Sequence, residues 1–373
     1  MTVNPFGDMF GDIFSLLQQQ GPDAWFQTAS QLALNIARGA DGDPNAEPVE
    51  RQRLEELAPL VARHVGALFD VVVGEDIDAV NRSALTAAAL EQWRPLIAPM
   101  IARGSDVATG LGEGTNELAA QMATVMGPLF AGFQMGSVAG HFSERAWSLA
   151  TLPLPRLSPR RLLVVNNLAH FAQEWSLERD EVYVFALAQE FVASLILTQP
   201  GTSDALRALL LDSVNEVSAV QGNLLERLQT MMQQGDLNDL MGDPASLLDG
   251  IELPDDSPAT RAINAASAAL LAVFDAVAFD VTTALFGPRP ALREAHQRHR
   301  LSDARGEDAA AALFGVATQG PHHDEARHFV TTLAEQHELA VFSAFLRVDG
   351  LPSADELAAP HAWFERVTNS PLA

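Results

Sequence analysis

The chain of 373 residues has 48 acidic and 23 basic side chains, a formal net charge of −25 at pH 7, and 48% hydrophobic residues. This charge repels phosphate backbones and anionic lipid headgroups, which argues against nucleic acids and acidic membrane surfaces as partners. Every basic side chain is Arg and there is no Cys. The composition therefore excludes lysine Schiff bases, P-loop lysines, thiolate nucleophiles and zinc bound by Cys.

The first 48 residues are predicted to form an N-terminal segment that is separate from the main body and dispensable for its folding. Apolar side chains at helical spacing predict a short amphipathic helix over 4–20, and the polar, Pro-containing run 38–50 predicts a flexible linker. Asp8 and Asp12 interrupt the first apolar stretch, so no secretory signal is recognised and a cytoplasmic location is expected. The Lys-free, Ala-rich composition is typical of high-GC bacterial genomes.

Residues 49–373 are predicted to form one mainly α-helical domain with long helices and a minor β component. After several helices in its first hundred residues, further helices are expected over 177–197, 203–234 and 258–285. One short strand is predicted at 162–165, where branched apolar residues follow one another.

The run 118–143 has no charged residue and is long enough to cross a bilayer. It also contains Gln, His and a Gly-Pro pair that would break or kink a helix, so a buried helix or helix pair is expected instead of membrane insertion. Gly132, Gly136 and Gly140 lie four residues apart on one helix face. This strip is predicted to let another backbone approach closely.

Most standard catalytic motifs are missing, and the His residues give weak patterns. His296 and His299 share a helix face but lie among Arg residues, so a solvated face is expected. His322, His323 and His328 are interpreted as exposed side chains in the first turns of a helix, with metal binding as the alternative if helical spacing brings them together.

Glu190 is the one charged residue in the otherwise apolar run 182–197. Burying an ionised carboxylate costs several kcal/mol, so the fold must supply a partner, a water-filled cleft or a raised pKa. Glu190 is therefore either a functional group or part of a thin polar stripe with Gln189.

Several stretches together are similar to one known family. They are 134–141, the Leu-Pro-Leu-Pro-Arg run 152–156, the strand and Trp-containing turn 162–175, the helix 182–197, and the C-terminal stretch 350–367. These stretches resemble the zincin-type zinc metalloproteases or hydrolases that are common in actinobacteria, some of which are linked to the biosynthesis of a deazaflavin coenzyme. The resemblance extends over most of the chain and implies a zincin-like fold.

The resemblance fails at the metal site. In that family the helix carries His-Glu-x-x-His, in which two His side chains bind zinc and the Glu polarises the metal-bound water. Gln189 and Ala193 stand at the zinc positions, and only Glu190, at the position of the general base, is kept. The downstream acidic motif of the family falls on Asp275, with Asp280 beyond it. The resemblance thus implies former metal positions at Gln189, Ala193 and Asp275 and a vestigial base at Glu190.

Two functional hypotheses follow from this comparison. The first is a catalytically inactive member of the family, with no metal cofactor, that acts as a scaffold or as the partner of another protein such as an active paralogue. The second is an active zinc-dependent hydrolase with a rebuilt site in which His170, Glu190, Asp275 and Asp280 converge. The metal content of the protein separates the two hypotheses.

Overall fold

The computed structural model describes residues 24–39, 42–110, 117–220, 257–301, 314–317 and 320–369. As the sequence predicted, the described chain is mainly α-helical and has two short strands. Its elements in chain order are α2 (Ala24–Arg38), α3 (Pro48–Phe69), β1 (Asp78–Val80), α4 (Arg82–Gly110), α5 (Glu117–Arg145), η1 (Leu149–Thr151), β2 (Leu162–Val164), α6 (Val165–Glu174), α7 (Arg179–Leu197), α8 (Pro200–Val220), α11 (Pro258–Phe286), α12 (Pro290–Leu301), α14 (Pro321–His337), η3 (Leu339–Leu346), α15 (Ala354–Ala358) and α16 (Pro360–Asn369).

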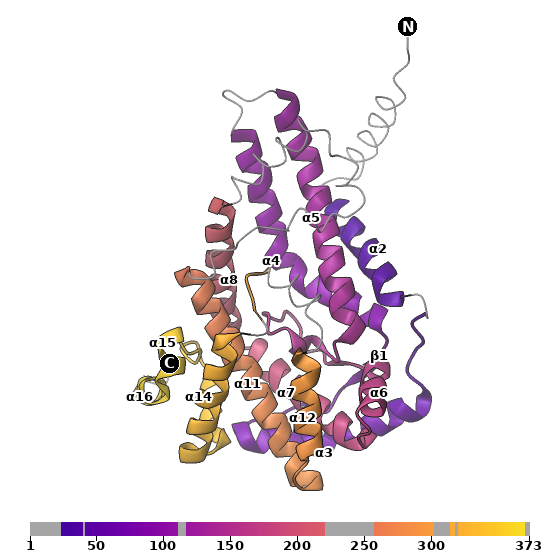
Figure 1. Ribbon diagram of the computed structural model, residues 1–373, viewed down its shortest axis with the longest axis vertical. Helices are drawn as coiled ribbons and strands as arrows, with labels where there is room; N and C mark the ends of the chain where they lie inside the picture. Colours follow the sequence, from indigo (N-terminus) through magenta and orange to yellow (C-terminus); the bar gives the residue numbers. More distant parts are fainter. Residues whose placement is uncertain are drawn as a thin grey trace.

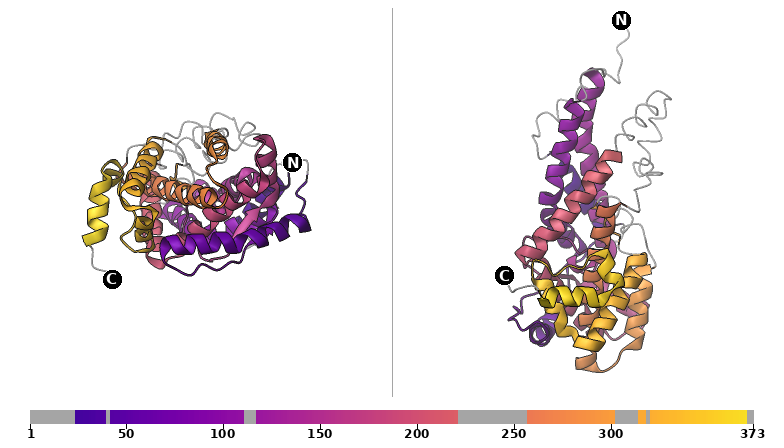
Figure 2. Two further views of the ribbon diagram at one scale, coloured as in Figure 1. Left: turned by 90° about the horizontal axis from the view of Figure 1, so that it is seen from below. Right: turned by 90° about the vertical axis from the view of Figure 1, so that its left-hand side faces the viewer.

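The molecule is elongated, with a broad body and a narrower projection (Figure 1). α4 and α5 pack along each other and rise away from the body, which contains α3, α7, α11, α12 and α14. Seen from below, α3 runs across the base of the body, where it packs on α7 (Figure 2). The candidate site residues therefore lie in the body, away from the projecting ends of α4 and α5.

The two strands form a small parallel sheet beside the body. β1 pairs with β2 with Asp78 opposite Leu162 and Val80 opposite Val164. The strand predicted at 162–165 is confirmed as β2, whose side chains are all buried. β1 was not predicted because its three residues include only two apolar side chains, which is too short a pattern to recognise. β2 leads directly into α6, and α7 follows after a short connection.

α7 and α11 form the centre of the core and pack against each other. Both are apolar on nearly all faces, as expected of helices enclosed on every side. Asp180 and Glu181 in the first turn of α7 favour its N-terminus electrostatically. α11 begins with Ser257 as its N-cap, whose side chain accepts from the Thr260 amide, and Pro258 follows at the first helical position. Polar side chains within either helix must find partners inside the protein.

The glycine strip on α5 is the contact surface for α2. A Cβ atom at Gly132 would lie 2.6 Å from the Trp25 carbonyl oxygen, and one at Gly136 would lie 2.7 Å from the Ala29 carbonyl oxygen. Trp25, Ala29 and Ala33 of α2 are buried there. The close approach predicted for the strip is confirmed. Its partner α2, however, belongs to the N-terminal segment 1–48 that the sequence analysis separated from the body. Small residues spaced along α2 allow it to pack closely on the glycines of α5.

Residues 42–47, expected to be a flexible linker, are hydrogen-bonded to the body. The two carboxylate oxygens of Asp43 accept from the backbone amides of Arg82 and Ser83 at the start of α4. The Asn166 side chain donates to the Pro44 carbonyl oxygen. The packing therefore joins residues 24–39 and 42–47 to the body, whereas the helix predicted over 4–20 lies outside the described residues.

α5 runs from Glu117 to Arg145 as one helix that includes the Gly-Pro pair, so of the two expected arrangements, a buried helix or a helix pair, the structure has the single helix. By length and composition, one described helix, α11, could cross a membrane, and α7 with α8 would count as a second only across an 85° bend. Of the most apolar stretch of α11, 61% is buried inside the protein, which is the pattern of a core helix. The run 118–143 is thus a helix that packs on α2 and α4.

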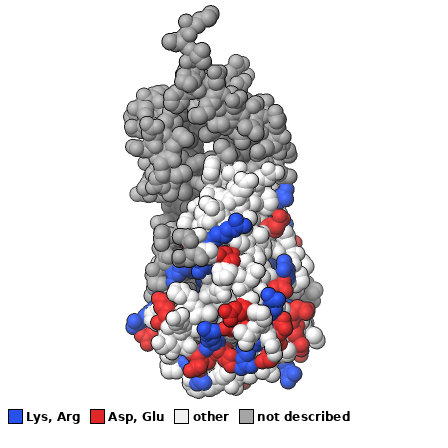
Figure 3. Space-filling view, turned by 90° about the vertical axis from the view of Figure 1, so that its right-hand side faces the viewer, with Lys and Arg blue, Asp and Glu red and all other residues white. Residues whose placement is uncertain are grey.

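Charged side chains are spread unevenly over the surface. Acidic and Arg side chains mix over the lower half of the face in Figure 3, and the described surface above them is sparsely charged. α2 has no charged residue before Arg38, and α5 has none between Glu117 and Glu144. α2 and the long middle part of α5 therefore contribute almost nothing to the net charge of the chain.

Candidate functional site

α7 carries three of the four residues that the resemblance placed at the family site, and the fourth, Asp275, lies on α11. Successive residues of an α-helix point about 100° apart, so Gln189 and Glu190 face different neighbours. Gln189 and Ala193, one turn apart, lie on one side of α7, while Glu190 is directed toward the loop that contains Arg156. The helix therefore separates the former metal positions from the position of the base.

Glu190 forms a bidentate ion pair with Arg156. Arg156 Nη1 donates to Glu190 Oε1 at 2.8 Å and Nη2 donates to Oε2 at 2.9 Å. The two side chains are 0% and 3% exposed, and the Leu162 amide lies 3.4 Å from Glu190 Oε1. The fold therefore stabilises the buried carboxylate with a charged partner, one of the three possibilities that the sequence left open. A general base needs a lone pair directed at a water molecule, whereas both oxygens of Glu190 are occupied and enclosed.

Gln189 and Asp275 meet in a second polar group, which we call the Asp275 cluster: Gln189 of α7, Asp275 of α11, and His296 and Arg300 of α12. Gln189 Nε2 donates to Asp275 Oδ1 at 2.7 Å, and Arg300 Nη1 donates to Asp275 Oδ2 at 2.9 Å. His296 Nε2 lies 3.8 Å from Asp275 Oδ1 and 3.5 Å from Gln189 Nε2. The structure thus brings two of the three former metal positions together and adds two residues that the sequence analysis did not place there.

The two His residues of α12 point into the protein. His296 is 4% exposed, and burial lowers its pKa to about 4. His299 stacks on the Trp147 ring with centroids 5.3 Å apart, and its Nδ1 accepts from Arg145 Nη2 at 2.9 Å. Burial and then the Arg145 charge lower the pKa of His299 to about 3. Both imidazoles are neutral at pH 7, and the predicted solvated face is wrong because the aromatic core accepts neutral rings.

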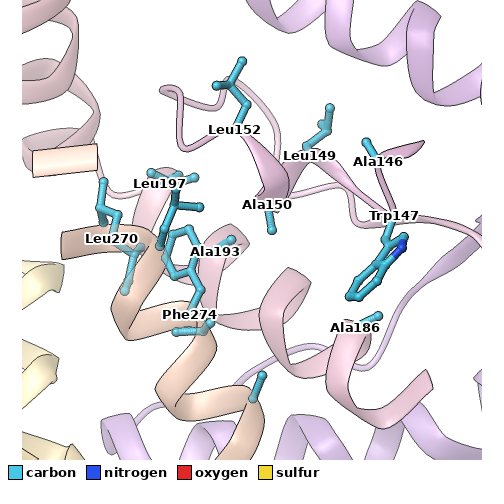
Figure 4. Packing of buried hydrophobic residues seen from close by; sticks show 14 of the residues in the cluster. Ala146, Trp147, Leu149, Ala150, Leu152, Ala186, Ala193, Leu197, Leu270 and Phe274 are labelled. Carbon is cyan, nitrogen blue, oxygen red and sulfur yellow. The ribbon is translucent and has the colours of Figure 1, made fainter. Parts of the chain in front are cut away.

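Ala193, at the second zinc position of the motif, is part of the apolar core. It is 0% exposed. Figure 4 shows its methyl group among apolar side chains of α7 and α11, including Leu197 and Phe274. A methyl group offers no donor atom, so this position contributes packing only.

His170 and Asp280 do not join the Asp275 cluster. Asp280 lies five residues after Asp275 on α11, which turns its side chain about 140° away. Its Oδ2 lies 3.0 Å from His64 Nε2 of α3. His170 of α6 is exposed. The convergence of His170, Glu190, Asp275 and Asp280 is therefore not found, because helix geometry directs these side chains to different neighbours.

The profile of the zincin-like metallopeptidase family matches residues 25–364, nearly the whole chain. The chain belongs to this family. It is also similar in structure to "a putative hydrolase with a novel fold" from Chloroflexus aurantiacus, with a TM-score of 0.60 and 14% sequence identity over 93% of this chain and 99% of that chain. At this identity the likeness shows the fold alone. No curated protein is significantly similar in sequence.

The donor atoms that the structure describes at the former metal positions do not fit a zinc ion. A catalytic zinc takes three protein ligands at about 2.0–2.2 Å. The described ranges contain no group of three or more His, Asp or Glu side chains placed to hold a metal. Arg300 Nη1 donates to Asp275 Oδ2, so a dication bound to this carboxylate would be repelled by the adjacent guanidinium charge.

The His residues at the start of α14 also bond to separate protein groups. His322 Nδ1 lies 2.9 Å from Glu325 Oε2, and His323 Nε2 donates to the Ala317 carbonyl oxygen at 3.2 Å. Burial lowers the pKa of His323 to about 4. His328 is exposed. In the part of the chain that the structure describes, these three side chains do not gather into a metal site.

A cavity of about 320 Å³ lies away from these groups, between α3 and the start of α7. Its charged side chains bond to one another, since Arg53 pairs with Asp180, and Arg179 and Tyr183 both bond to Glu50. Burial and the adjacent Glu50 raise the pKa of Tyr183, so its hydroxyl stays a donor at neutral pH. This cavity does not open onto the Asp275 cluster.

Proposed function

We propose that this zincin-like chain is not a metal-dependent peptidase and acts by binding another protein. The observation that carries the proposal is the ion pair of Glu190 with Arg156, which occupies both oxygens of the only family catalytic group that the sequence keeps. A carboxylate that is 0% exposed offers neither oxygen to solvent water, and separating it from Arg156 would strand a buried guanidinium.

The former metal positions support the same proposal. Gln189 contributes an amide that donates to Asp275, and Ala193 contributes no donor atom. Asp275, which has the right chemistry for a metal, is bonded on its second oxygen to Arg300. The side chains at these positions therefore hydrogen-bond to one another within the chain and do not form an open coordination sphere for a metal.

The alternative is an active hydrolase with a site rebuilt from His170, Glu190, Asp275 and Asp280. The hydrolase description of the Chloroflexus aurantiacus protein favours this class of activity in general terms. The individual contacts disfavour it, because Glu190, Asp275 and Asp280 bond to three different partners.

The binding role is proposed for the cytoplasm, with a catalytically active relative as the partner. Its support is that the described helices share one buried apolar core, while the ligand positions implied by the resemblance are packing and hydrogen-bonding groups. The net charge of −25 disfavours nucleic acid as the partner.

The proposal is tested by a peptidase assay and a binding assay on the full-length chain. We expect no cleavage of an unstructured protein substrate with added zinc, and no difference between the unmodified chain and Asp275→Asn. Cleavage that stops on chelation and is lost in Asp275→Asn would overturn the inactive assignment. For the binding role, the chain is mixed with a relative that keeps His-Glu-x-x-His. Light scattering is expected to report a complex, and two separate proteins would refute that partner.

A further inference from the structure

We propose that Arg300 is an internal cation that replaces the metal of the family: it neutralises Asp275, holds α12 on the α7–α11 pair, and excludes metal ions from the site. This inference rests on the proposed function and assigns the residue that keeps the site closed.

The first support is connectivity. The former metal positions implied by the resemblance lie on two helices, α7 and α11, and the Asp275 cluster joins these two and α12 through one carboxylate. Asp275 of α11 accepts from Gln189 of α7 on Oδ1 and from Arg300 of α12 on Oδ2. Removing Arg300 would leave one oxygen of Asp275 without this donor.

The second support is charge. Within the Asp275 cluster, Asp275 is the one carboxylate and Arg300 the one guanidinium, while Gln189 is neutral. His296 packs its ring against Trp147 and Phe185, an apolar setting that disfavours a positive charge. The negative charge of Asp275 and the positive charge of Arg300 therefore cancel within the cluster. A dication added beside Arg300 would leave it with a net charge of +2.

The third support is the placement of Arg300 relative to its neighbour on the same helix. Arg298 is 63% exposed and pairs with Glu294 one turn away, as solvated surface arginines do. Arg300 is 27% exposed and reaches Asp275, which is 20% exposed. An ion pair that is partly enclosed is screened less by water than one on the surface. Arg298 therefore serves as a matched control, with the same side chain and charge on the same helix.

The experiment uses a background in which the two lost imidazoles are restored by Gln189→His with Ala193→His. The dissociation constant for zinc is measured by competition with a chelating dye in this background, and again after adding Arg300→Gln or Arg298→Gln. We expect Arg300→Gln to tighten zinc binding by at least about tenfold, because a like charge beside the metal is removed. Arg298→Gln should change it by less than about threefold, as expected of an exposed charge.

Equal effects of the two substitutions, or no zinc binding in any variant, would overturn the role of Arg300. Zinc bound by the unmodified chain would instead overturn the proposed function, so the two failures are distinguishable. If Arg300→Gln does not fold in this background, Arg300→Lys is used, which keeps the charge and loses the planar fork. It is expected to leave zinc as weakly bound as in the background, and tighter binding would contradict the charge argument.

A second readout is amide hydrogen exchange in the chain without the restored His residues. Arg300→Gln is expected to speed exchange within α12, whereas Arg298→Gln should leave it unchanged. Unchanged exchange in both variants would show that Arg300 does not hold α12.

Discussion

Removing Glu190 is expected to destabilise the protein strongly, because Arg156 would keep a buried charge without its partner. The substitution Glu190→Ala deletes two charge-assisted hydrogen bonds of 2.8 and 2.9 Å. Arg156 Nε is also buried and has no hydrogen-bond partner among the described residues, so the described structure offers the stranded guanidinium little compensation.

The magnitude follows from the burial of the pair. Breaking a fully buried ion pair on one side costs about 3–5 kcal/mol, against a total stability of about 5–15 kcal/mol for a typical domain. Replacing both partners with apolar side chains of similar size is often close to neutral. We therefore expect Glu190→Leu with Arg156→Met to recover most of the stability that Glu190→Ala loses.

The assay is urea unfolding followed by circular dichroism for the four members of a double-mutant cycle. A large loss in each single variant and recovery in the double variant would support a structural pair. Removing a carboxylate that is kept for catalysis is instead expected to leave the stability unchanged or to raise it, because functional groups are commonly held at a cost in stability. An increase in stability for Glu190→Ala would therefore refute the argument that the pair closes the site.

The remaining predictions concern packing, the N-terminal helix and pH. Gly136→Leu should cost on the order of 1–3 kcal/mol, since a Cβ there would lie 2.7 Å from the Ala29 carbonyl oxygen, and an unchanged melting temperature would contradict this. Deleting residues 1–45 removes α2 and should lower the melting temperature or the yield of soluble protein, whereas melting like the full chain would place α2 outside the core. His296 and His299 have pKa values lowered by burial to about 4 and about 3, so the unfolded chain binds protons more readily. Their contribution to stability is complete above about pH 6.5 and is lost as the pH falls toward 4; stability that does not decrease over this range would contradict their burial as neutral rings.

Local patterns in the sequence were sufficient for most of the elements. Helical periodicity predicted α7 and α11, and a run of apolar residues predicted β2. The capping box of Ser353 and Glu356, in which each side chain bonds to the backbone of the other, is a local motif of the same kind. These features depend on neighbours within a few residues, which a single sequence displays directly.

For contacts between residues far apart in the sequence, the sequence predicted that a partner is needed but not which residue supplies it. The sequence indicated that Glu190 needs a partner, but 23 Arg residues could supply it, and Arg156 lies 34 positions away. The glycines of α5 predicted a close neighbour without identifying α2. His296 was predicted to be exposed because its charged neighbours dominate the local sequence, whereas packing on α7 and α11 decides which side of α12 is buried.

The most direct test of the account is the metal content of the purified full-length chain after expression with added zinc. Elemental analysis is expected to find well below about 0.1 equivalents of zinc, because Asp275 is bonded to Gln189 and Arg300 and the other former positions lack suitable donors. About one equivalent of zinc that is retained through gel filtration and lost in both Asp275→Asn and His296→Ala would contradict the central claim that this family site no longer binds a metal.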